Sequence, residues 1–427
     1  MAQGALPGFR DFYPEQFAER AYIMDVWRSV LRRYAFVEYD GPPLEPLDLY
    51  RKKSGDELVG QLYSFTDKGD REVAMRPEMT PTFARMVAAR ANALRKPVRW
   101  FSIPQLFRYE RQQKGRLREH FQLNADIVGE TGVTADAELV ALALDVMRAL
   151  GLDQSQVKAR VSDRRLLHAL LLHAEIPDDS TAAVYAVIDK RGREPADVFR
   201  EKLVNSAGSE TKAESIESFL ACSDFTELAS RVGHAPELAP HFDRMREYFK
   251  YVDALGFTEW VRFDLSIVRG LAYYTGIVFE LFDTAGEFRA ICGGGRYDTL
   301  LQTLGGVDLP ALGFGMGDVV LGELLRKRGL FPSTAPRTDF WVAADDESLM
   351  PDVMRVASQL RRSGQSVEYA LKPQQLSRQL KAANAAGADR AVLLRSTSLA
   401  EGNVTVKDLS SGDENSLPLS DLINSLQ

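Results

Sequence analysis

The residues from 118 to 128 alternate between polar and apolar side chains, and this pattern restricts the fold more than any other feature of the sequence. The two sets are Arg118, His120, Gln122, Asn124 and Asp126 against Phe121, Leu123, Ala125 and Ile127, with Glu119 as the exception. Successive side chains of an extended strand point to opposite faces, so the pattern predicts a strand with one face on a core. Alternation alone is most often the mark of an ordinary solvated strand.

Strand-like and helical segments surround this strand. A second strand-like run covers 97–110, and the basic loop 111–117 joins it to 118–128. Helices are predicted at 16–36, 80–93, 134–150 and 317–328, the first from apolar residues at every third or fourth position. Thr80 is the predicted N-cap of the second helix and Pro81 its first residue. Strand character returns at 260–267 and 276–283.

The chain divides into regions that differ in predicted secondary structure and in motif content. Residues 151–258 are helix-rich and poor in motifs, and we interpret them as an insertion into a core formed by 1–150 and 259–328. Residues 329–338 form a linker with prolines and a serine. Strands and helices then alternate over 339–427, which predicts a separate small α/β domain. A length of 427 residues fits such a multidomain chain.

Composition limits the class of protein. The net charge of −7 argues mildly against a nucleic-acid partner. The two cysteines, Cys222 and Cys292, exclude a disulfide scaffold and a cysteine-based zinc site and suit a reducing compartment. The N-terminus does not resemble a signal peptide, and no apolar run is long enough for a membrane span. We therefore expect a cytoplasmic protein without a membrane partner.

Positive charge is concentrated in one window. Residues 90–118 contain nine basic residues and one acid, Glu110. Arginine offers a planar fork to phosphate oxygens, so this hairpin is a candidate phosphate site. A solvated basic face is the simpler explanation on composition alone. Arg108 and the face that carries Gln122 and Asp126 belong to neighbouring predicted strands, however, and can converge on one pocket.

Two further segments are candidates for ligand contacts. The run 269–276 combines an arginine, two adjacent tyrosines and two glycines, which suits either a tight turn at a small ligand or a sheet edge with packed tyrosines. The glycines 293–295 permit close backbone approach but lack the Lys-Ser/Thr of a phosphate loop. The five histidines show no nucleophile motif or metal-ligand spacing, so no metal site is predicted.

Together these segments resemble a class II aminoacyl-tRNA synthetase, and among that class the histidyl-tRNA synthetase family. The segments that carry the resemblance are Pro7–Pro14, 33–45, Arg76–Thr80, Phe107–Glu110, Lys114–Arg116, 122–126, Arg269–Tyr274, Gly293–Asp298 and the region from about 338. The Arg269–Tyr274 run is the most specific of them, and the insertion is the least recognisable part. In the first class motif, the usual glycine is replaced by Ala35.

The resemblance implies an architecture and an activity. The fold would be α+β: an antiparallel class II sheet flanked by helices, a helical insertion and a C-terminal α/β anticodon-binding-like domain. The activity would be that of a histidine–tRNA ligase, which activates L-histidine with ATP and transfers it to the 3′ end of tRNA(His). Mg²⁺ would enter with ATP, no prosthetic group would be needed, and the first class motif implies a homodimer.

The resemblance also implies roles for individual residues. Arg108 and Arg269 would be catalytic. The histidine-binding set would be Glu78, Met79, Thr80, Arg108, Gln122, Asp126, Arg269, Tyr273 and Tyr274, with Asp126 and Tyr274 on the imidazole nitrogens. The ATP-binding set would be Arg108, Glu110 and Arg116. Gln113 would face the acceptor end of the tRNA.

Two departures from the family pattern stand out. The third class motif normally ends in an arginine that contacts adenine and the γ-phosphate, and Val320 takes its place here. Arg289 is a candidate to replace this charge. Asp126 stands where many members have glutamate, so its carboxylate is one methylene shorter.

The missing arginine favours an alternative from another class of protein. The regulatory subunit of ATP phosphoribosyltransferase is a histidine-sensing, non-catalytic relative of similar fold. Retention of Arg108, Arg116, Arg269 and both tyrosines favours the ligase, as does the C-terminal α/β domain, which the regulatory relative generally lacks.

Overall fold

The computed structural model describes residues 4–51, 60–109, 117–268, 273–333 and 338–426 in two units. Unit 1 covers Met1–Pro332 and unit 2 covers Ser333–Gln427. Each is described separately below. No helix among the described residues is both long and apolar enough to cross a membrane.

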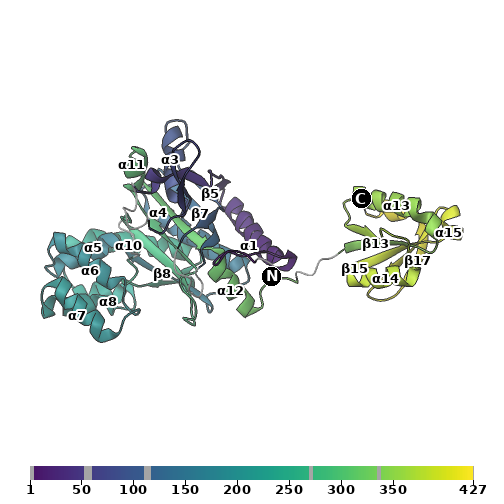
Figure 1. Cartoon of the computed structure of the whole chain (residues 1–427). Helices are drawn as coiled ribbons and strands as arrows, with labels where there is room; N and C mark the ends of the chain where they lie inside the picture. The colour runs from purple at the N-terminus through teal and green to yellow at the C-terminus, as the bar shows by residue number, and fades with distance from the viewer. Residues whose placement is uncertain (1–3, 52–59, 110–116, 269–272, 334–337, 427) are drawn as a thin grey trace. The chain divides into compact units, whose positions relative to one another are not determined.

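A mostly antiparallel sheet organises unit 1 (Figure 1). Its strands run in the order β1-β5-β7-β12-β11-β10-β8-β9, and β6 pairs with β7 at one side. Only the outer pairs β1–β5 and β8–β9 are parallel. The strands are β1 (Val37–Glu38), β5 (Val98–Ser102), β6 (Gln105–Phe107), β7 (Glu119–Val128), β8 (Val157–Asp163), β9 (Val261–Phe263), β10 (Ile277–Asp283), β11 (Cys292–Arg296) and β12 (Ala311–Gly317). The predicted fold class is confirmed.

The alternation along β7 has the predicted effect. Leu123, Ala125 and Ile127 are buried in the main hydrophobic core. The exception in the pattern, Glu119, is buried as well, and the cost of burying its charge is offset by two bonds from Arg10 and one from the amide of Gln105. The opposite face, with Gln122 and Asp126, is left for other contacts.

Helices cover the sheet and bury its apolar face. The helices outside the helix-rich segment are α1 (Pro14–Arg33), α3 (Thr80–Arg90), α4 (Val133–Ala149), α11 (Leu300–Gly305) and α12 (Asp318–Arg328). Helix α4 packs on β8, β11 and β12 and also against α1. Helix α3 begins at Thr80 rather than after it: Met79 is the capping residue, without a side-chain cap bond, and Pro81 is the second helical residue. A small sheet of β2 (Leu44–Pro46), β4 (Glu72–Met75) and β3 (Ser64–Thr66) completes this part.

The turn after α1 places Ala35 in an unusual conformation. Its φ is +58°, the left-handed region that favours glycine. The backbone N–H of Ala35 bonds to the carbonyl of Arg32 and that of Phe36 to Leu31, which ends the helix in the manner of a glycine C-cap. Ala35 therefore occupies a backbone position suited to the glycine that the family pattern has there.

A helix-rich segment follows β8 and lies at one end of unit 1 (Figure 1). It comprises α5 (Arg164–His173), α6 (Thr181–Ile188), α7 (Ala196–Ala207), α8 (Glu210–Leu220), α9 (Phe225–Val232) and α10 (Ala239–Ala254). The predicted insertion of 151–258 contains β8, yet β8 pairs with β10 and β9 in the main sheet. Its start therefore needs correction, because β8 gains its partners from residues about a hundred positions later.

Buried charges join the helix-rich segment to the sheet. Arg296 of β11 forms an ion pair with Asp136 of α4 at 2.7 Å, and both side chains are almost fully buried. Arg244 of α10 lies 3.7 Å from Asp136 and 3.5 Å from Asp163 at the end of β8. Removing one partner from such a network would leave an uncompensated buried charge.

Unit 2 is an α/β domain with its own core. Its sheet has the order β14-β13-β15-β16-β17, parallel over the first three strands and antiparallel after them. The elements are β13 (Thr338–Ala344), α13 (Met350–Arg362), β14 (Val367–Tyr369), α14 (Leu376–Ala385), β15 (Ala388–Leu394), α15 (Ser396–Ala400), β16 (Asn403–Asp408), β17 (Glu414–Pro418) and α16 (Leu419–Asn424). The alternating strands and helices predicted from residue 339 are present.

Candidate active site

The polar face of β7 opens into a cavity of about 820 Å³ in unit 1. Arg108, His120 and Gln122 line one side of it. The rest is lined by Leu117, by Arg193 from the helix-rich segment, and by residues of β10, the loop after it, β11, β12 and α12: Glu280, Phe282, Arg289, Ala290, Ile291, Cys292, Gly293, Gly315, Gly317, Val319 and Val320. The cavity is large enough for a nucleotide-sized ligand.

Arg108 is held in place by a neighbouring motif. Its Nε donates to the carbonyl of Pro77 at 3.0 Å, and its backbone N–H bonds to Arg118 at 2.9 Å. Arg76 anchors that neighbouring segment in turn, because its buried guanidinium donates to Asp40, Gly41 and Gln105. The predicted residues Glu78, Met79 and Thr80 follow directly. They do not line the cavity; Met79 is buried, and Glu78 and Thr80 are half-buried.

Glycines on β12 make room for the two predicted side chains of β7. In the register of β7 and β12, Asp126 lies opposite Gly313 and Gln122 lies opposite Gly317. Gly315, two residues before Gly317, is the glycine next to the Gln122 side chain. A Cβ at Gly313 would stand 2.1 Å from Asp126 Oδ1, and one at Gly315 would stand 2.9 Å from Gln122 Cδ. Any larger residue would collide with the carboxylate or the amide.

Asp126 is joined to a cluster of three tyrosines. Tyr297 Oη donates to Asp126 Oδ1, and both side chains are buried. Ring centroids of Tyr273 and Tyr274 lie 4.7 Å apart, and each ring packs near Tyr297. Burial, and then the nearby Asp126 charge, raise the pKa of Tyr297 well above its ordinary value. Tyr297 therefore stays protonated and remains a donor to Asp126.

His120 is neutral in the cavity wall. Burial, followed by the positive charges of Arg108 and Arg10, lowers the pKa of His120 to about 3. A protonated imidazole would be disfavoured here at any ordinary pH. His120 thus contributes hydrogen-bonding capacity but no positive charge.

Four predicted site residues lie outside the described residues. They are Glu110, Gln113, Arg116 and Arg269. Of the predicted site residues that the structure describes, Arg108 and Gln122 line one cavity. Asp126, Tyr273 and Tyr274 all contact Tyr297.

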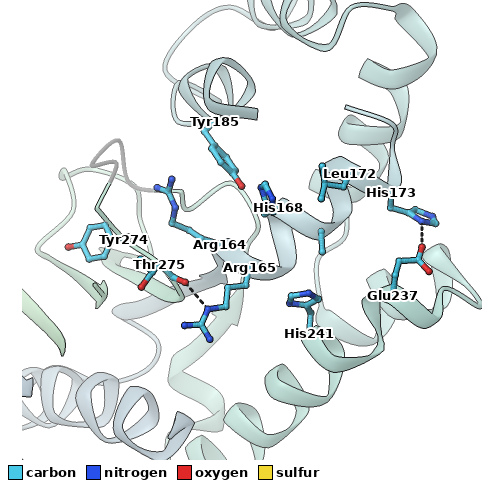
Figure 2. A pocket seen from close by; sticks show the side chains of 11 residues that line it. Arg164, Arg165, His168, Leu172, His173, Tyr185, Glu237, His241, Tyr274 and Thr275 are labelled. Carbon is cyan, nitrogen blue, oxygen red and sulfur yellow. Dashed lines mark hydrogen bonds and ion pairs between the residues drawn. The ribbon is translucent and has the colours of Figure 1, made fainter. Parts of the chain in front are cut away.

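A second cavity of about 700 Å³ adjoins the tyrosine cluster along α5 (Figure 2). Tyr274 and Thr275 form one end of it. Arg165 donates to the carbonyl of Thr275 at 2.8 Å and to Asp298 at 2.7 Å, which braces the chain next to Tyr274. His168 and His173 also line it, but each faces a carboxylate, Asp178 and Glu237 respectively. Arg108 and Gln122 line the larger cavity, whereas Tyr274 lines this one.

The described residues contain no cluster of side chains that could bind a metal ion without a substrate. In the parts of unit 1 and unit 2 that the structure describes, no three His, Cys, Asp or Glu side chains gather as a metal site requires. Glu280 is the one carboxylate among the described residues that line the larger cavity.

Sequence reasoning missed Tyr297, Glu280 and His120 as site residues. Tyr297 lies inside the 293–298 run. The glycines of this run predict close backbone approach, but they do not predict a role for the tyrosine that follows them. Glu280 carries a usable signal, since it is a single charged residue inside the apolar run of β10. Arg289, suggested as a substitute for the missing arginine, does line the cavity together with Val320.

Comparisons with known proteins show which chains this one is similar to. A family model described as histidyl-tRNA synthetase matches residues 8–317, and a model described as anticodon binding domain matches 338–427. The chain is 42% identical to the histidine–tRNA ligase of Opitutus terrae, covering 97% of this chain and 95% of that protein. It is 41% identical to the chloroplastic/mitochondrial histidine–tRNA ligase of Arabidopsis thaliana, covering 97% and 85%. The crystal structure of histidyl-tRNA synthetase from Nostoc sp. PCC 7120 has the same fold, with a TM-score of 0.84, 23% identity and coverage of 100% and 99%.

Proposed function

The chain belongs to the histidyl-tRNA synthetase family, and we propose that the 820 Å³ cavity with its neighbouring tyrosine cluster is where it carries out the family's reaction. The enzyme is a histidine–tRNA ligase that uses histidine, ATP and tRNA. Histidine and ATP give histidyl-adenylate and diphosphate, and the histidyl group then passes to tRNA with release of AMP. Positioning and charge neutralisation drive such phosphoryl chemistry.

The polar face of β7 carries this assignment. Gln122 lines the cavity together with Arg108, and Asp126 is buried further along the same face with a tyrosine donor. We assign Asp126 and Tyr274 to the imidazole, Tyr273 to the pocket wall, and Gln122 with Glu78, Met79 and Thr80 to the surroundings of the α-amino group. A site whose buried polar groups need both ring nitrogens rejects analogues that lack them.

The ATP side of the site rests on arginines. We assign Arg108, together with Arg116, to the phosphates, Glu110 to the adenine, and Arg269 to the histidine carboxylate and the α-phosphate. The anchored position of Arg108 supports its role, because a guanidinium held by Pro77 needs little reordering to meet a phosphate. Mg²⁺ would enter as part of the MgATP substrate, which suits the single carboxylate, Glu280, among the described cavity residues.

The partners extend beyond the cavity. We assign unit 2 to the anticodon of tRNA(His) and Gln113 to its acceptor end, and we propose a cytoplasmic homodimer that pairs through the region of 33–45. The family-model match over 338–427 supports the first assignment. Light scattering tests the dimer, which requires a mass near twice 47.6 kDa.

The alternative of a histidine-sensing regulatory subunit rests on Val320 alone. A sensor has no need of an anticodon-binding domain or of phosphate-binding arginines. The phosphate-binding capacity of the site thus separates the two functions.

Histidine-dependent ATP–diphosphate exchange, followed by charging of tRNA, tests the proposed function. We expect exchange in the wild type, none in Arg269→Ala, and a KM for histidine raised about 10- to 100-fold in Asp126→Asn, which loses a charged hydrogen-bond acceptor. Asp25→Asn, at an exposed position of α1, is the control. Tight histidine binding with no exchange in the wild type would favour the regulatory role instead.

A further inference from the structure

One wall of the cavity offers no charge to ATP. Val319 and Val320, in the first turn of α12, line the cavity and are half-buried. Val320 also packs against the main core. If this cavity binds ATP, as the proposed function requires, a triphosphate beside α12 meets aliphatic side chains where other class II enzymes present an arginine.

The positive charge in the cavity comes from other elements. Among the described residues that line it, the cations are Arg108, Arg193 and Arg289. Arg108 is held at Pro77, on the side of the 76–80 segment. His120 adds no charge, because its pKa is lowered to about 3. Among the described residues that line the cavity, Arg193 and Arg289 are therefore the cations that remain for a triphosphate next to α12.

Arg289 is carried by a loop that is firmly braced. The loop joins β10 to β11, and the buried Asp283 accepts the backbone N–H of Glu287 at 2.9 Å and of Phe288 at 3.0 Å. Lys327 of α12 pairs with Glu287 at 2.5 Å and lies 5.9 Å from the ring of Phe288. The two residues before Arg289 are thus tied to the helix that carries Val320.

Arg193 lies on a less constrained support. It follows α6 in the helix-rich segment, its side chain is 65% exposed, and it pairs with Asp189 at 3.3 Å. An exposed, flexible arginine must lose more conformational freedom to hold a phosphate than one on a braced loop.

We propose that Arg289 supplies the phosphate-binding charge that Val320 leaves absent, by contacting the β- and γ-phosphates of ATP. In adenylate formation a histidine carboxylate oxygen forms a bond to the α-phosphorus, and the bond from that phosphorus to the bridging oxygen breaks. The electron pair leaves with diphosphate. Arg289 neutralises the charge that grows on this leaving group, so its role is specific to the part of ATP that AMP lacks.

Binding and exchange measurements on matched variants test this role. We expect Arg289→Ala to weaken ATP binding and raise the KM for ATP about 10- to 100-fold, the range for a lost charge-assisted hydrogen bond. AMP binding and the KM for histidine should change less than about twofold, and Arg289→Lys should recover part of the loss. Arg328→Ala, on α12 but outside the cavity lining, is the matched control and should behave as wild type.

A second-site variant provides a positive test. Adding Val320→Arg to Arg289→Ala should restore the KM for ATP to within about threefold of wild type, because a positive charge returns to the cavity from α12. Unchanged ATP affinity in Arg289→Ala would overturn the proposal, as would an equal loss of ATP and AMP binding. A selective loss in Arg193→Ala instead would move the role to the helix-rich segment.

The proposal rests on the proposed function, yet the two can fail separately. A wild type that binds ATP but lacks exchange would refute the ligase function. Calorimetric titration of ATP and AMP into wild type and Arg289→Ala would still decide the role of Arg289.

Discussion

Under the proposed function, Asp126 and Tyr274 bind the two nitrogens of the histidine ring, and the surroundings of Asp126 suit this role. Its burial removes water as a competing partner, and Tyr297 occupies one of its oxygens. This bond favours one orientation of the carboxylate, with Oδ1 toward the Tyr297 hydroxyl. This arrangement suits a side chain that is one methylene shorter than glutamate.

The first prediction concerns Tyr297→Phe. The change removes the hydroxyl that donates to Asp126 and keeps the ring in the aromatic cluster. We expect the KM for histidine to rise about 10-fold while the KM for ATP stays unchanged, because a hydrogen bond to a charged group is lost on the amino-acid side only. Steady-state exchange kinetics measure both values.

Tyr248→Phe is the matched control for this variant. Tyr248 is fully buried on α10, and its hydroxyl finds no hydrogen-bond partner in the part of the chain that the structure describes. Loss of that hydroxyl should leave both KM values as in the wild type. An equal change in both tyrosine variants would mean that Tyr297 acts through general stability.

The second prediction concerns pH and His120. The pKa of His120 is about 3 in the folded protein and about 6.5 in the unfolded chain, so between these values the unfolded state binds more protons. Stability therefore falls as the pH drops below about 6.5, with about 2 kcal/mol lost at pH 5 through this residue. His120→Gln should remove that part of the acid sensitivity.

Urea unfolding at pH 7.5 and pH 5 measures this effect. His234→Gln, at an exposed position, should keep the acid sensitivity of the wild type. The prediction fails if both histidine variants lose the same stability between the two pH values.

A local sequence pattern predicts some of the candidate site residues. The positions of the others depend on strand pairing between residues that are distant in the sequence. The two-residue period of 118–128 was enough to place Gln122 and Asp126 on one face. The bond from Tyr297 to Asp126 spans 171 positions and depends on the register of β7, β12 and β11. No local pattern carries that register, which is why Tyr297 was missed.

At the scale of elements, the glycines of β11 and β12 let the two strands lie close beneath the site. A Cβ at Gly294 would stand 2.4 Å from the carbonyl oxygen of Gly313. The glycine run of 293–295 was predicted to allow close backbone approach, and it does so inside a central strand of the sheet. Its position in the sheet could not be read from the run itself.

Gly313→Ala is the third prediction. The new methyl group would lie 2.1 Å from Asp126 Oδ1 and 2.8 Å from the carbonyl oxygen of Ala125, so Asp126 must move. We expect a KM for histidine raised at least about 10-fold and a loss of about 1–3 kcal/mol in unfolding free energy. Gly322→Ala in α12 has no contact closer than 3.8 Å and should instead gain up to about 1 kcal/mol. Equal effects of the two changes would contradict the role of Gly313.

The fourth prediction concerns the end of α1. Ala35 holds a φ of +58°, so Ala35→Gly should relieve the steric cost of that conformation and stabilise the protein by about 0.5–1 kcal/mol. Ala21→Gly makes the same change inside α1 and should destabilise by about 1 kcal/mol. Urea unfolding midpoints compare the two, and a loss of stability in both would show that Ala35 carries no strain.

Element prediction succeeded where periodicity is local and failed where pairing is distant. The helices near 16–36, 134–150 and 317–328 have the predicted positions within a few residues. Strand β8 was assigned to the insertion because its neighbours along the chain are helical, whereas its partners β9 and β10 are distant in sequence. Because the segments that follow β8 in the sequence are helical, β8 could not be recognised from the sequence as a strand of the core sheet.

At the scale of the whole molecule, net charge was a poor guide to partners. The chain carries −7, yet three arginines and one carboxylate are the charged side chains among the described residues lining the cavity. Residues 339–427 hold nine basic and twelve acidic side chains, so the positive charge is not in unit 2 either. Under the proposed function, acidic surroundings limit unspecific binding to RNA, and the arginines of the cavity attract ATP.

The fifth prediction separates the two units. Each has its own sheet and core, so residues 1–332 and 333–427 should each fold when produced alone. Residues 1–332 should retain exchange activity within about threefold and lose tRNA charging by about 100-fold or more, because one of two linked binding modules is absent. A fragment 1–332 that folds but has no exchange activity would contradict this division of roles.

Under the proposed role of Asp126, the bare backbone of β12 opposite it also limits how the specificity can be changed toward histidine analogues. Gly313 and Gly315 carry no side chain that could be trimmed, so room for a bulkier ring cannot be made on that side. Tyr297 is needed to hold the carboxylate. A library that seeks to attach a larger unnatural amino acid should therefore begin at Tyr273, which packs on Tyr274 and Tyr297 without being the donor to Asp126.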